Sequence, residues 1–140
     1  MKKKAETAAR LTVENATWSE PRYKETILHP ISFDLAPHTI LGVVGPNGSG
    51  KSTLLRLLYR FNAPTTGTVE VDNTDIWSIS AKEAARIVAA VLQEQPADFG
   101  LTVREIVALG RTPYRKLFGG LTSTRDEEVL QGVLDQLGLN

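Results

Sequence analysis

The sequence predicts an α/β fold in which a parallel sheet is accompanied by a smaller antiparallel side sheet. Two observations support this prediction. From residue 39 onward, short apolar runs alternate with segments of helical periodicity, which is typical of a parallel sheet with crossover helices. Before residue 39, the strand-like segments 11–13 and 27–35 have no helix between them, so we expect them to pair in the side sheet.

The chain begins with Met1 and three lysines, and no hydrophobic stretch follows them. We therefore expect residues 1–10 to form a flexible tail rather than a signal peptide.

Pro37 and His38 predict a tight turn before the next strand. His38 lacks the partner groups that catalysis needs, so we interpret it as a turn residue with a positive φ.

Residues 39–44 are apolar and β-branched, which predicts a short strand buried on both faces. The next segment matches the pattern G-x-x-x-x-G-K-[ST], with Gly45 first, Lys51 near the end and Ser52 last. Glycines let backbone N–H groups approach an anion, the lysine supplies charge for the β- and γ-phosphates, and the hydroxyl can coordinate Mg²⁺. The pattern therefore predicts a nucleoside triphosphate site.

A loop of this kind should also open a helix. We expect that helix to begin at Gly50 and Lys51, with the positive end of its dipole facing the phosphates. Apolar residues recur at helical spacing after the loop. They are Leu54, Leu55, Leu57, Leu58 and Phe61.

Further elements are predicted downstream. Residues 68–71 alternate as a half-exposed strand, Asp72 and Asn73 form a plausible turn, and residues 88–92 predict a buried strand that ends at Gln93. Three helix starts share a Ser or Thr followed three residues later by Glu, the signature of a capping box. The pairs are Ser80 and Glu83, Thr102 and Glu105, and Thr124 and Glu127.

The last helix should end at Gly138, and residues 118–121 are an obvious flexible joint before it.

The bulk composition excludes several classes of function. The 16 basic residues balance the 16 acidic ones, which gives no support to a nucleic-acid partner. Cysteine is absent, and His29 and His38 lie far from any acidic cluster, so no metal site of cysteines or histidines is predicted. No apolar run approaches membrane-spanning length, so we expect a soluble, cytosolic chain.

Three segments together resemble one known family. Residues 45–55 (GPNGSGKSTLL) are similar to the phosphate loop of ATP-binding cassette (ABC) ATPases, and residues 90–93 (AVLQ) resemble the strand and glutamine of their Q-loop. Residues 101–114 (LTVREIVALGRTPY) resemble the first helical-subdomain segment of the importers of iron chelates, siderophores, haem and cobalamin.

The resemblance covers nearly the whole chain from Leu11 and implies a P-loop NTPase fold. Residues 11–95 would form the N-terminal part of the RecA-like ATP-binding core with its antiparallel β-subdomain. Residues 96–140 would form the Q-loop segment and the start of the α-helical subdomain.

The same resemblance implies ATP and Mg²⁺ as cofactors and gives each motif residue a role. Lys51 would bridge the β- and γ-phosphates, Ser52 would ligate Mg²⁺ and Thr53 would reach the α-phosphate. Gln93 would contact Mg²⁺ and the attacking water, which a neutral amide can hold in line without acting as a base. The implied nucleotide-binding residues are Trp18, Gly45, Asn47, Gly48, Ser49, Gly50, Lys51, Ser52 and Thr53; the implied catalytic residues are Lys51 and Gln93, and the implied metal ligands are Ser52 and Gln93.

The family also places an aromatic ring against adenine, upstream of the phosphate loop. Trp18 is the first choice, because residues 13–18 match the strand that usually carries the ring. Tyr23 is the rival if the loop after that strand has a different length. Either ring could stack on a base.

The chain departs from the family after the helical segment. Its 140 residues contain no Leu-Ser-Gly-Gly signature loop, no aspartate-bearing strand with a catalytic glutamate and no switch histidine. Hydrolysis needs a group that polarises water and an acidic partner for Mg²⁺, so this stretch would hold half of a site. The central sheet would also be incomplete. We therefore expect Val43, Val44 and residues 88–92 to leave apolar edges exposed, and the isolated chain to be unstable or poorly soluble.

The leading interpretation is an ATP-binding subunit, or its N-terminal fragment, of an importer that couples ATP hydrolysis to uptake of an iron chelate, haem or cobalamin-type compound. The implied partners are membrane permease subunits, a second copy in a head-to-tail dimer and, indirectly, an extracytoplasmic substrate-binding protein. The implied location is the cytoplasmic face of the cell membrane. Two alternatives stay open: a truncated nucleotide-binding module without ATPase activity, and a non-transport ABC protein acting on DNA or the ribosome.

Overall fold

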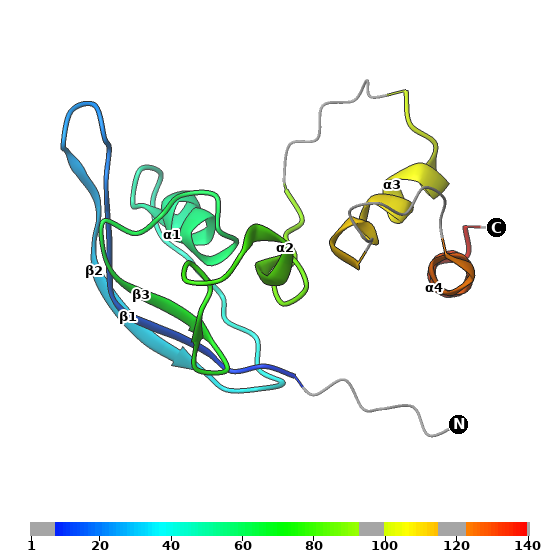
Figure 1. Ribbon diagram of the computed structural model, residues 1–140. Helices are drawn as coiled ribbons and strands as arrows, with labels where there is room; N and C mark the ends of the chain where they lie inside the picture. Colours follow the sequence, from blue (N-terminus) through cyan, green and yellow to red (C-terminus); the bar gives the residue numbers. More distant parts are fainter. Residues whose placement is uncertain (1–7, 93–99, 115–122, 140) are drawn as a thin grey trace. The chain divides into compact units, whose positions relative to one another are not determined.

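The computed structural model describes residues 8–92, 100–114 and 123–139, and the chain divides into two compact units (Figure 1). We call Met1–Val88 the sheet unit and Ala89–Asn140 the helical unit. Gln93 and the joint predicted at residues 118–121 lie outside the described residues, so the domain boundary expected after residue 95 stays a prediction. Across the ranges that the structure describes, no helix combines the length and the apolar character needed to cross a membrane.

A four-stranded antiparallel sheet forms the base of the sheet unit, with its strands in the order β2-β1-β3-β4 (Figure 1). The antiparallel pairing of the first two strands confirms the prediction of a side sheet. Pro30 lies in β2, an edge strand, which is the position where a sheet tolerates a residue without a backbone N–H. The strands are β1 (Leu11–Ser19), β2 (Thr26–Leu35), β3 (Thr66–Val71) and β4 (Thr74–Asp75).

A bulge in β1 determines how β3 approaches it. Asn15 has a φ of 46°, and the register between β1 and β3 shifts between Glu14 and Thr17. Opposite this bulge, Gly67 has a φ of 80°, and a Cβ placed there would lie 2.3 Å from the carbonyl oxygens of both Glu14 and Asn15. Only glycine allows β3 to lie this close to the bulge.

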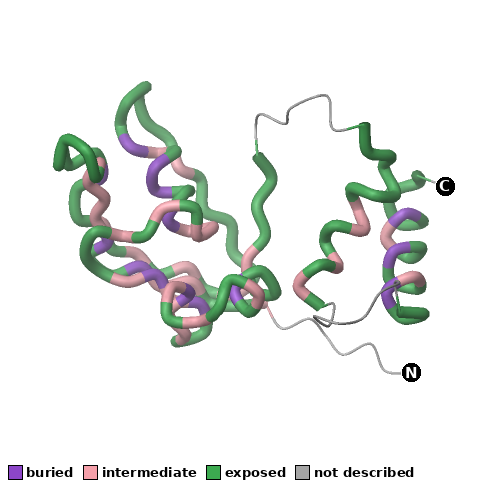
Figure 2. The backbone as a smooth tube through the Cα atoms, turned by 45° about the horizontal axis from the view of Figure 1, so that its top comes forward, coloured by how far each residue is buried: buried purple, intermediate pink, exposed green. Residues whose placement is uncertain are grey.

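The core of the sheet unit lies between the strands and helix α1 (Lys51–Leu58), as the buried positions in Figure 2 show. Short helix α2 (Ala81–Ala84) adds one buried alanine, Ala84. Partly buried side chains, including Trp18 and Trp77, pack around this cluster. Its buried residues are Val13, Ala16, Leu28, Leu54, Leu57, Val69, Val71 and Ile76.

Two predicted strands do not form, and both predictions are wrong in the described structure. Residues 39–44 and 88–92 take part in no strand pairing. The side chains of Ile40, Val44 and Val91 are 98%, 91% and 96% exposed, respectively. A buried strand needs neighbours on both edges to satisfy its backbone N–H and C=O groups, and no described residues provide them.

The same segments were expected to leave apolar edges exposed. The structure confirms this for some of their residues and not for others. Val44 and Val91 are exposed, as expected. Val43 and Val88 instead pack against the core cluster of the sheet unit.

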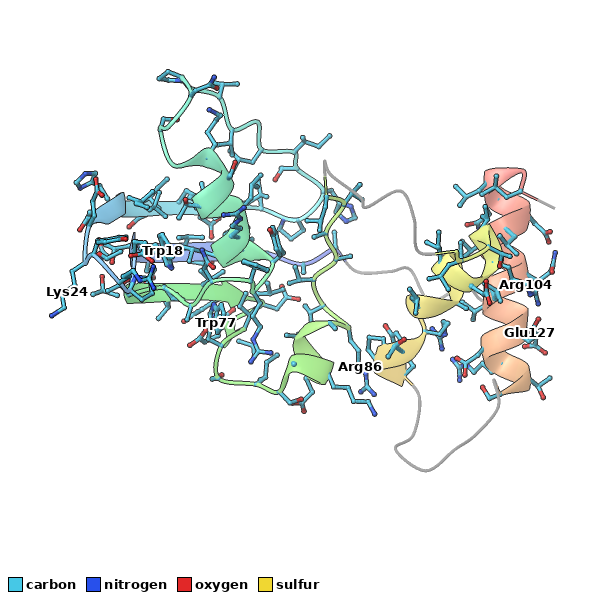
Figure 3. The ribbon with its side chains drawn as sticks, turned by 90° about the horizontal axis from the view of Figure 1, so that it is seen from above. Trp18, Lys24, Trp77, Arg86, Arg104 and Glu127 are labelled. Carbon is cyan, nitrogen blue, oxygen red and sulfur yellow. The ribbon has the colours of Figure 1, made fainter. Side chains whose placement is uncertain are left out.

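The described part of the helical unit contains α3 (Val103–Leu109), the short 3₁₀ helix η1 (Thr112–Tyr114) and α4 (Thr124–Leu137). Leu130 and Leu134 of α4 are buried, whereas α3 has no buried residue. Polar contacts connect α4 to α3 and to the residues that follow α3. Arg111 Nε donates to Asp126 Oδ1 at 2.7 Å, and Arg104 forms an ion pair with Glu127 (Figure 3).

Two of the three predicted capping boxes are confirmed, at Ser80 with Glu83 and at Thr102 with Glu105. In the first, the Ser80 hydroxyl and then its backbone N–H donate to the Glu83 carboxylate and lower the pKa of Glu83. In the second, the backbone N–H of Thr102 and then its hydroxyl lower the pKa of Glu105. Each box is therefore strongest when its glutamate is ionised.

The third predicted capping box, at Thr124 and Glu127, is wrong by one residue. Ser123 is the N-cap of α4 and accepts from the backbone N–H of Asp126 at 3.2 Å. The Ser123 hydroxyl also donates to Asp126 Oδ2 at 2.8 Å and, together with Arg111, lowers the pKa of Asp126. Ser123 and Thr124 carry the same hydroxyl group one position apart, and Arg111 and Arg104 pair with Asp126 and Glu127 when Ser123 is the cap.

The predicted turns are confirmed. His38 has a φ of 62°, and Asp72 and Asn73, between β3 and β4, have φ values of 48° and 63°. Gly138 ends α4 with a φ of 65°, the left-handed conformation that glycine adopts without a Cβ penalty.

Candidate nucleotide-binding site

The phosphate-loop sequence lies where the motif requires, directly before a helix. Residues 45–49 are exposed, and α1 begins at Lys51, as predicted. Gly50 is the N-cap, with a φ of 85°, and it is buried against β2. A Cβ on Gly50 would lie 3.2 Å from the carbonyl oxygen of Ile27 and 3.4 Å from Leu28 Cδ1. The start of α1 can therefore lie this close to β2 because Gly50 has no side chain.

The first turn of α1 differs from those of α2, α3 and α4. Each of those three helices has a Ser or Thr N-cap whose side chain accepts a backbone hydrogen bond, and each has an acidic residue in its first turn. The N-cap of α1 is Gly50, no side chain caps it, and its first turn has no acidic residue. The N-terminal backbone N–H groups of α1 thus keep their affinity for an external anion.

The charge of Lys51 is held over the loop. Its Nζ donates to the carbonyl oxygens of Gly45 and Pro46, at 2.8 Å and 2.7 Å. These contacts fold the side chain back from the first helical residue across the loop. A cation and the positive end of a helix dipole therefore meet at one place, which favours the binding of a polyanion such as a triphosphate.

The two hydroxyl residues after Lys51 lie in different surroundings. Ser52 is exposed, as a residue that meets a hydrated cation must be, whereas Thr53 is buried. The described residues contain no cluster of three or more His, Asp or Glu that could hold a metal ion. Ser52 could contribute one hydroxyl oxygen to an Mg²⁺ site whose other ligands include phosphate oxygens and water. Gln93, the other predicted ligand, lies outside the described residues.

The two candidate adenine platforms are arranged differently. Trp18 in β1 is the cross-strand partner of Leu28 in β2, so both side chains lie on the same face of the sheet, and Leu28 borders Gly50 at the start of α1. Figure 3 shows Trp18 along this strand. Tyr23 is 74% exposed and lies in a turn whose backbone N–H groups donate to the Glu20 carboxylate.

Sequence reasoning missed the groups that hold the loop in place. These are the carbonyl oxygens of Gly45 and Pro46, which accept from Lys51, and the side chain of Leu28, which borders Gly50. No residue pattern marks them, because a backbone carbonyl is present whatever the side chain and the contact with Leu28 is long-range.

Comparison with known proteins gives a consistent result. Residues 28–140 match the ABC transporter family. The chain is 42% identical over 98 residues to the cobalamin import ATP-binding protein BtuD of Halobacterium salinarum, covering 70% of this chain and 25% of that protein. It is 34% identical over 134 residues to the ferric enterobactin transport ATP-binding protein FepC of Escherichia coli, covering 96% and 48%.

A solved structure of a metal-chelate type ABC transporter in an inward-facing conformation matches with a TM-score of 0.66 at 29% identity, covering 95% of this chain and 46% of that one. The predicted fold class is thereby confirmed. The chain spans less than half the length of each of these relatives.

Proposed function

The chain belongs to the ABC transporter family, and we propose that it is part of an ATP-binding subunit that powers import of an iron chelate, haem or cobalamin-type compound. One observation carries the ATP-binding part of this proposal. The helix after the phosphate loop starts at an uncapped glycine, Gly50, and the ammonium group of Lys51 is held across the loop before it. The importer part is supported by the relatives named for cobalamin and ferric enterobactin.

In the proposed site, the residues of the chain bind and orient the nucleotide. Backbone N–H groups from Asn47 to Lys51 surround the β-phosphate, and the Lys51 ammonium exchanges its loop carbonyls for β- and γ-phosphate oxygens. Ser52 holds the metal ion, and Thr53 reaches the α-phosphate. Mg²⁺, when bound, neutralises charge on the transferred phosphoryl group.

Adenine and the attacking water are held by residues outside the loop. Trp18 stacks on the base, and its pairing with Leu28 beside Gly50 supports it over Tyr23. Gln93 contacts the metal ion and orients water with a neutral amide. An acidic Mg²⁺ ligand and a closing signature loop come, in this proposal, from other parts of the subunit and from a second copy in a head-to-tail dimer.

The proposal also assigns partners and a location. The subunit works on the cytoplasmic face of the cell membrane, attached to permease subunits that receive cargo from an extracytoplasmic substrate-binding protein. The cargo is selected by those partners, and the ATP-binding subunit supplies the free energy of nucleotide binding and hydrolysis.

Replacing Lys51 with alanine tests the site. Each charge-assisted hydrogen bond to phosphate contributes about 1.5–3 kcal/mol. We therefore expect ATP affinity in the full-length subunit to fall by roughly tenfold to a hundredfold. Titration calorimetry measures the change. Arg56→Ala, which removes an exposed cation from the last turn of the same helix, is the matched control and should leave affinity unchanged. Wild-type affinity in Lys51→Ala would overturn the assignment of the phosphate loop.

A second pair of variants separates the two adenine platforms. Base stacking on an aromatic side chain contributes about 1–3 kcal/mol, so Trp18→Ala should lower ATP affinity by roughly tenfold, whereas Tyr23→Ala should leave it unchanged. Affinity for inorganic triphosphate, which has no base, should be the same in both variants. The reverse pattern for ATP would assign the platform to Tyr23.

A further inference from the structure

Leu28 in β2 borders two parts of the proposed nucleotide site. It is the cross-strand partner of Trp18 in β1. Directly opposite residues on one face of an antiparallel pair have Cβ atoms about 4.5–5.5 Å apart, so the indole ring and the leucine side chain are neighbours. Leu28 Cδ1 also lies 3.4 Å from the position that a Cβ on Gly50 would occupy. One side chain therefore borders both the candidate adenine platform and the N-cap of the phosphate-loop helix.

Packing fixes the position of Leu28. Its side chain is 7% exposed and belongs to the core cluster of the sheet unit, which also contains Leu54 of α1. Trp18 is partly buried and packs against the same cluster. The backbone beside Leu28 is equally close to the helix, because the carbonyl oxygen of Ile27 lies 3.2 Å from the Cβ position of Gly50. In a close-packed core, Leu28 cannot shift without moving these neighbours.

The strand that carries Trp18 is irregular on both sides of this residue. Its register against β2 shifts between Ala16 and Trp18, and again between Trp18 and Ser19. Such irregularities change the direction of a side chain and are common beside active sites. A regular ladder therefore does not determine where the Trp18 ring lies, and its packing partners carry more of that role.

Hydrogen bonds to Thr65 hold the backbone on both sides of Trp18. The backbone N–H of Ser19 donates to Thr65 Oγ1 at 2.9 Å, and the backbone N–H of Thr65 donates to the carbonyl oxygen of Thr17 at 2.8 Å. The main chain at Trp18 is thus fixed by the residue that precedes β3, while the Trp18 side chain packs beside Leu28.

We propose that Leu28 is a positioning residue for the nucleotide. It supports the Trp18 ring and fixes the distance from that ring to the start of α1, so that the surfaces for the base and for the phosphates are held in a set relation. This role rests on the proposed function, in which Leu28 contacts neither phosphate nor metal ion. A ring held in place before the ligand arrives binds the base at a lower cost in ordering.

The test compares two ligands in the full-length subunit. We define the affinity ratio as the Kd for inorganic triphosphate divided by the Kd for ATP, so that it reports what the nucleoside adds to binding. Leu28→Ala should lower this ratio by roughly threefold to tenfold, because stacking on Trp18 weakens. The Kd for inorganic triphosphate should stay within about twofold, since the phosphate loop and the backbone of Ile27 are unchanged. Titration calorimetry measures both constants.

A double variant tests whether Leu28 acts through Trp18. When Leu28→Ala is added to Trp18→Ala, the affinity ratio should fall by less than about twofold further, because the lost support has no ring to act on. Leu28→Met conserves the side-chain volume and should keep the wild-type ratio.

Val71→Ala is the matched control for the cavity. Val71 in β3 belongs to the same core cluster and is 6% exposed, but it pairs with Leu11, at the opposite end of β1 from Trp18. This variant should destabilise the protein and leave the affinity ratio unchanged.

An unchanged affinity ratio in Leu28→Ala would overturn the proposal, even if both Kd values rise, because equal losses indicate a merely structural role. An equal fall in Val71→Ala, or full additivity with Trp18→Ala, would overturn it as well. If Leu28→Ala folds poorly, Leu28→Val makes a smaller cavity and should lower the ratio by a smaller factor; an unchanged ratio in that variant would overturn the proposal.

Failure of the proposed function would give a different result. Lys51→Ala would then bind ATP and inorganic triphosphate as the wild type does, whatever the affinity ratio in the Leu28 variants. A loss of binding in Lys51→Ala together with an unchanged ratio in Leu28→Ala would reject the role of Leu28 alone.

Discussion

The sheet unit and the helical unit are each held together internally by different interactions. The sheet unit buries a cluster of eight apolar residues between its strands and α1. In the described part of the helical unit, two leucines of α4 are buried, and ion pairs and hydrogen bonds also connect α4 to α3 and to the residues after it. Figure 2 shows this contrast in the distribution of buried positions.

The difference predicts how each unit responds to solution conditions and to substitutions. The phosphate loop needs a fixed backbone, and apolar packing beneath α1 provides one that changes little with pH or salt. The helices of the second unit are joined partly by charges, whose interactions weaken when they are protonated or screened. The sheet unit should therefore respond mainly to changes in side-chain volume and the helical unit also to changes in charge. Three experiments, ordered by the size of the expected effect, test this contrast.

Removing apolar volume beneath the phosphate-loop helix should have the largest effect. Leu57 in α1 is completely buried. Leu57→Ala should lower the free energy of unfolding by about 2–5 kcal/mol, through lost burial and the cavity left behind. Denaturant unfolding of the full-length protein measures it. Leu55→Ala, on the same helix but 47% exposed, is the control and should cost much less. Equal losses of unfolding free energy in the two variants would contradict the view that apolar packing stabilises α1.

Asp126→Asn should give a smaller effect that depends on pH. The hydroxyl of Ser123 and the guanidinium of Arg111 lower the pKa of Asp126 below its ordinary value of 3.8. A lowered pKa in the folded state means that ionised Asp126 stabilises the protein above pH 3.8, and that this contribution disappears as the pH falls through the folded-state pKa. The variant should thus melt below the wild type at neutral pH.

The difference between the melting temperatures of the wild type and Asp126→Asn should shrink as the pH is lowered into the acid range. Thermal unfolding followed at several pH values measures this trend. A difference that stays constant with pH would mean that Asp126 acts through its shape and not through its charge.

Arg104→Ala should have the smallest effect. Its ion pair with Glu127 joins α3 to α4, but both side chains are 47% exposed. Exposed ion pairs contribute about 0–1 kcal/mol, so we expect unfolding free energy to change by less than about 0.5 kcal/mol. Added salt should reduce this small difference further. A loss of unfolding free energy as large as that of Leu57→Ala would show that exposed ion pairs are the main stabilising interaction of the helical unit.

Local signals predicted local structure well. The start of α1 at Lys51, the positive φ of His38 and the capping boxes at Ser80 and Thr102 depend on residues within a few positions of one another, and all were predicted correctly. The cap of α4 was misplaced because Ser123 and Thr124 carry the same hydroxyl chemistry one position apart. Their sequence offers no basis for choosing between them.

Long-range structure was less predictable. The apolar runs at 39–44 and 88–92 have strand composition, but a strand forms only beside a partner, and composition does not provide one. No sequence pattern predicts the contacts of Arg60. Its side chain donates to the carbonyl oxygen of Ile79 and lies over the ring of Trp77, nineteen and seventeen residues away. The phosphate loop itself was recognisable because its chemistry is confined to nine consecutive residues.

In the proposed site, the uncapped start of α1 would couple ligand binding to folding. A helix whose N-cap has no side chain leaves its first turn without an internal partner, and a bound phosphate would act as the missing cap. The nucleotide would then complete an element of secondary structure in addition to occupying a site. By linkage, the stability of the sheet unit would depend on nucleotide concentration, rising by about 2.7 kcal/mol when free ligand exceeds its Kd a hundredfold.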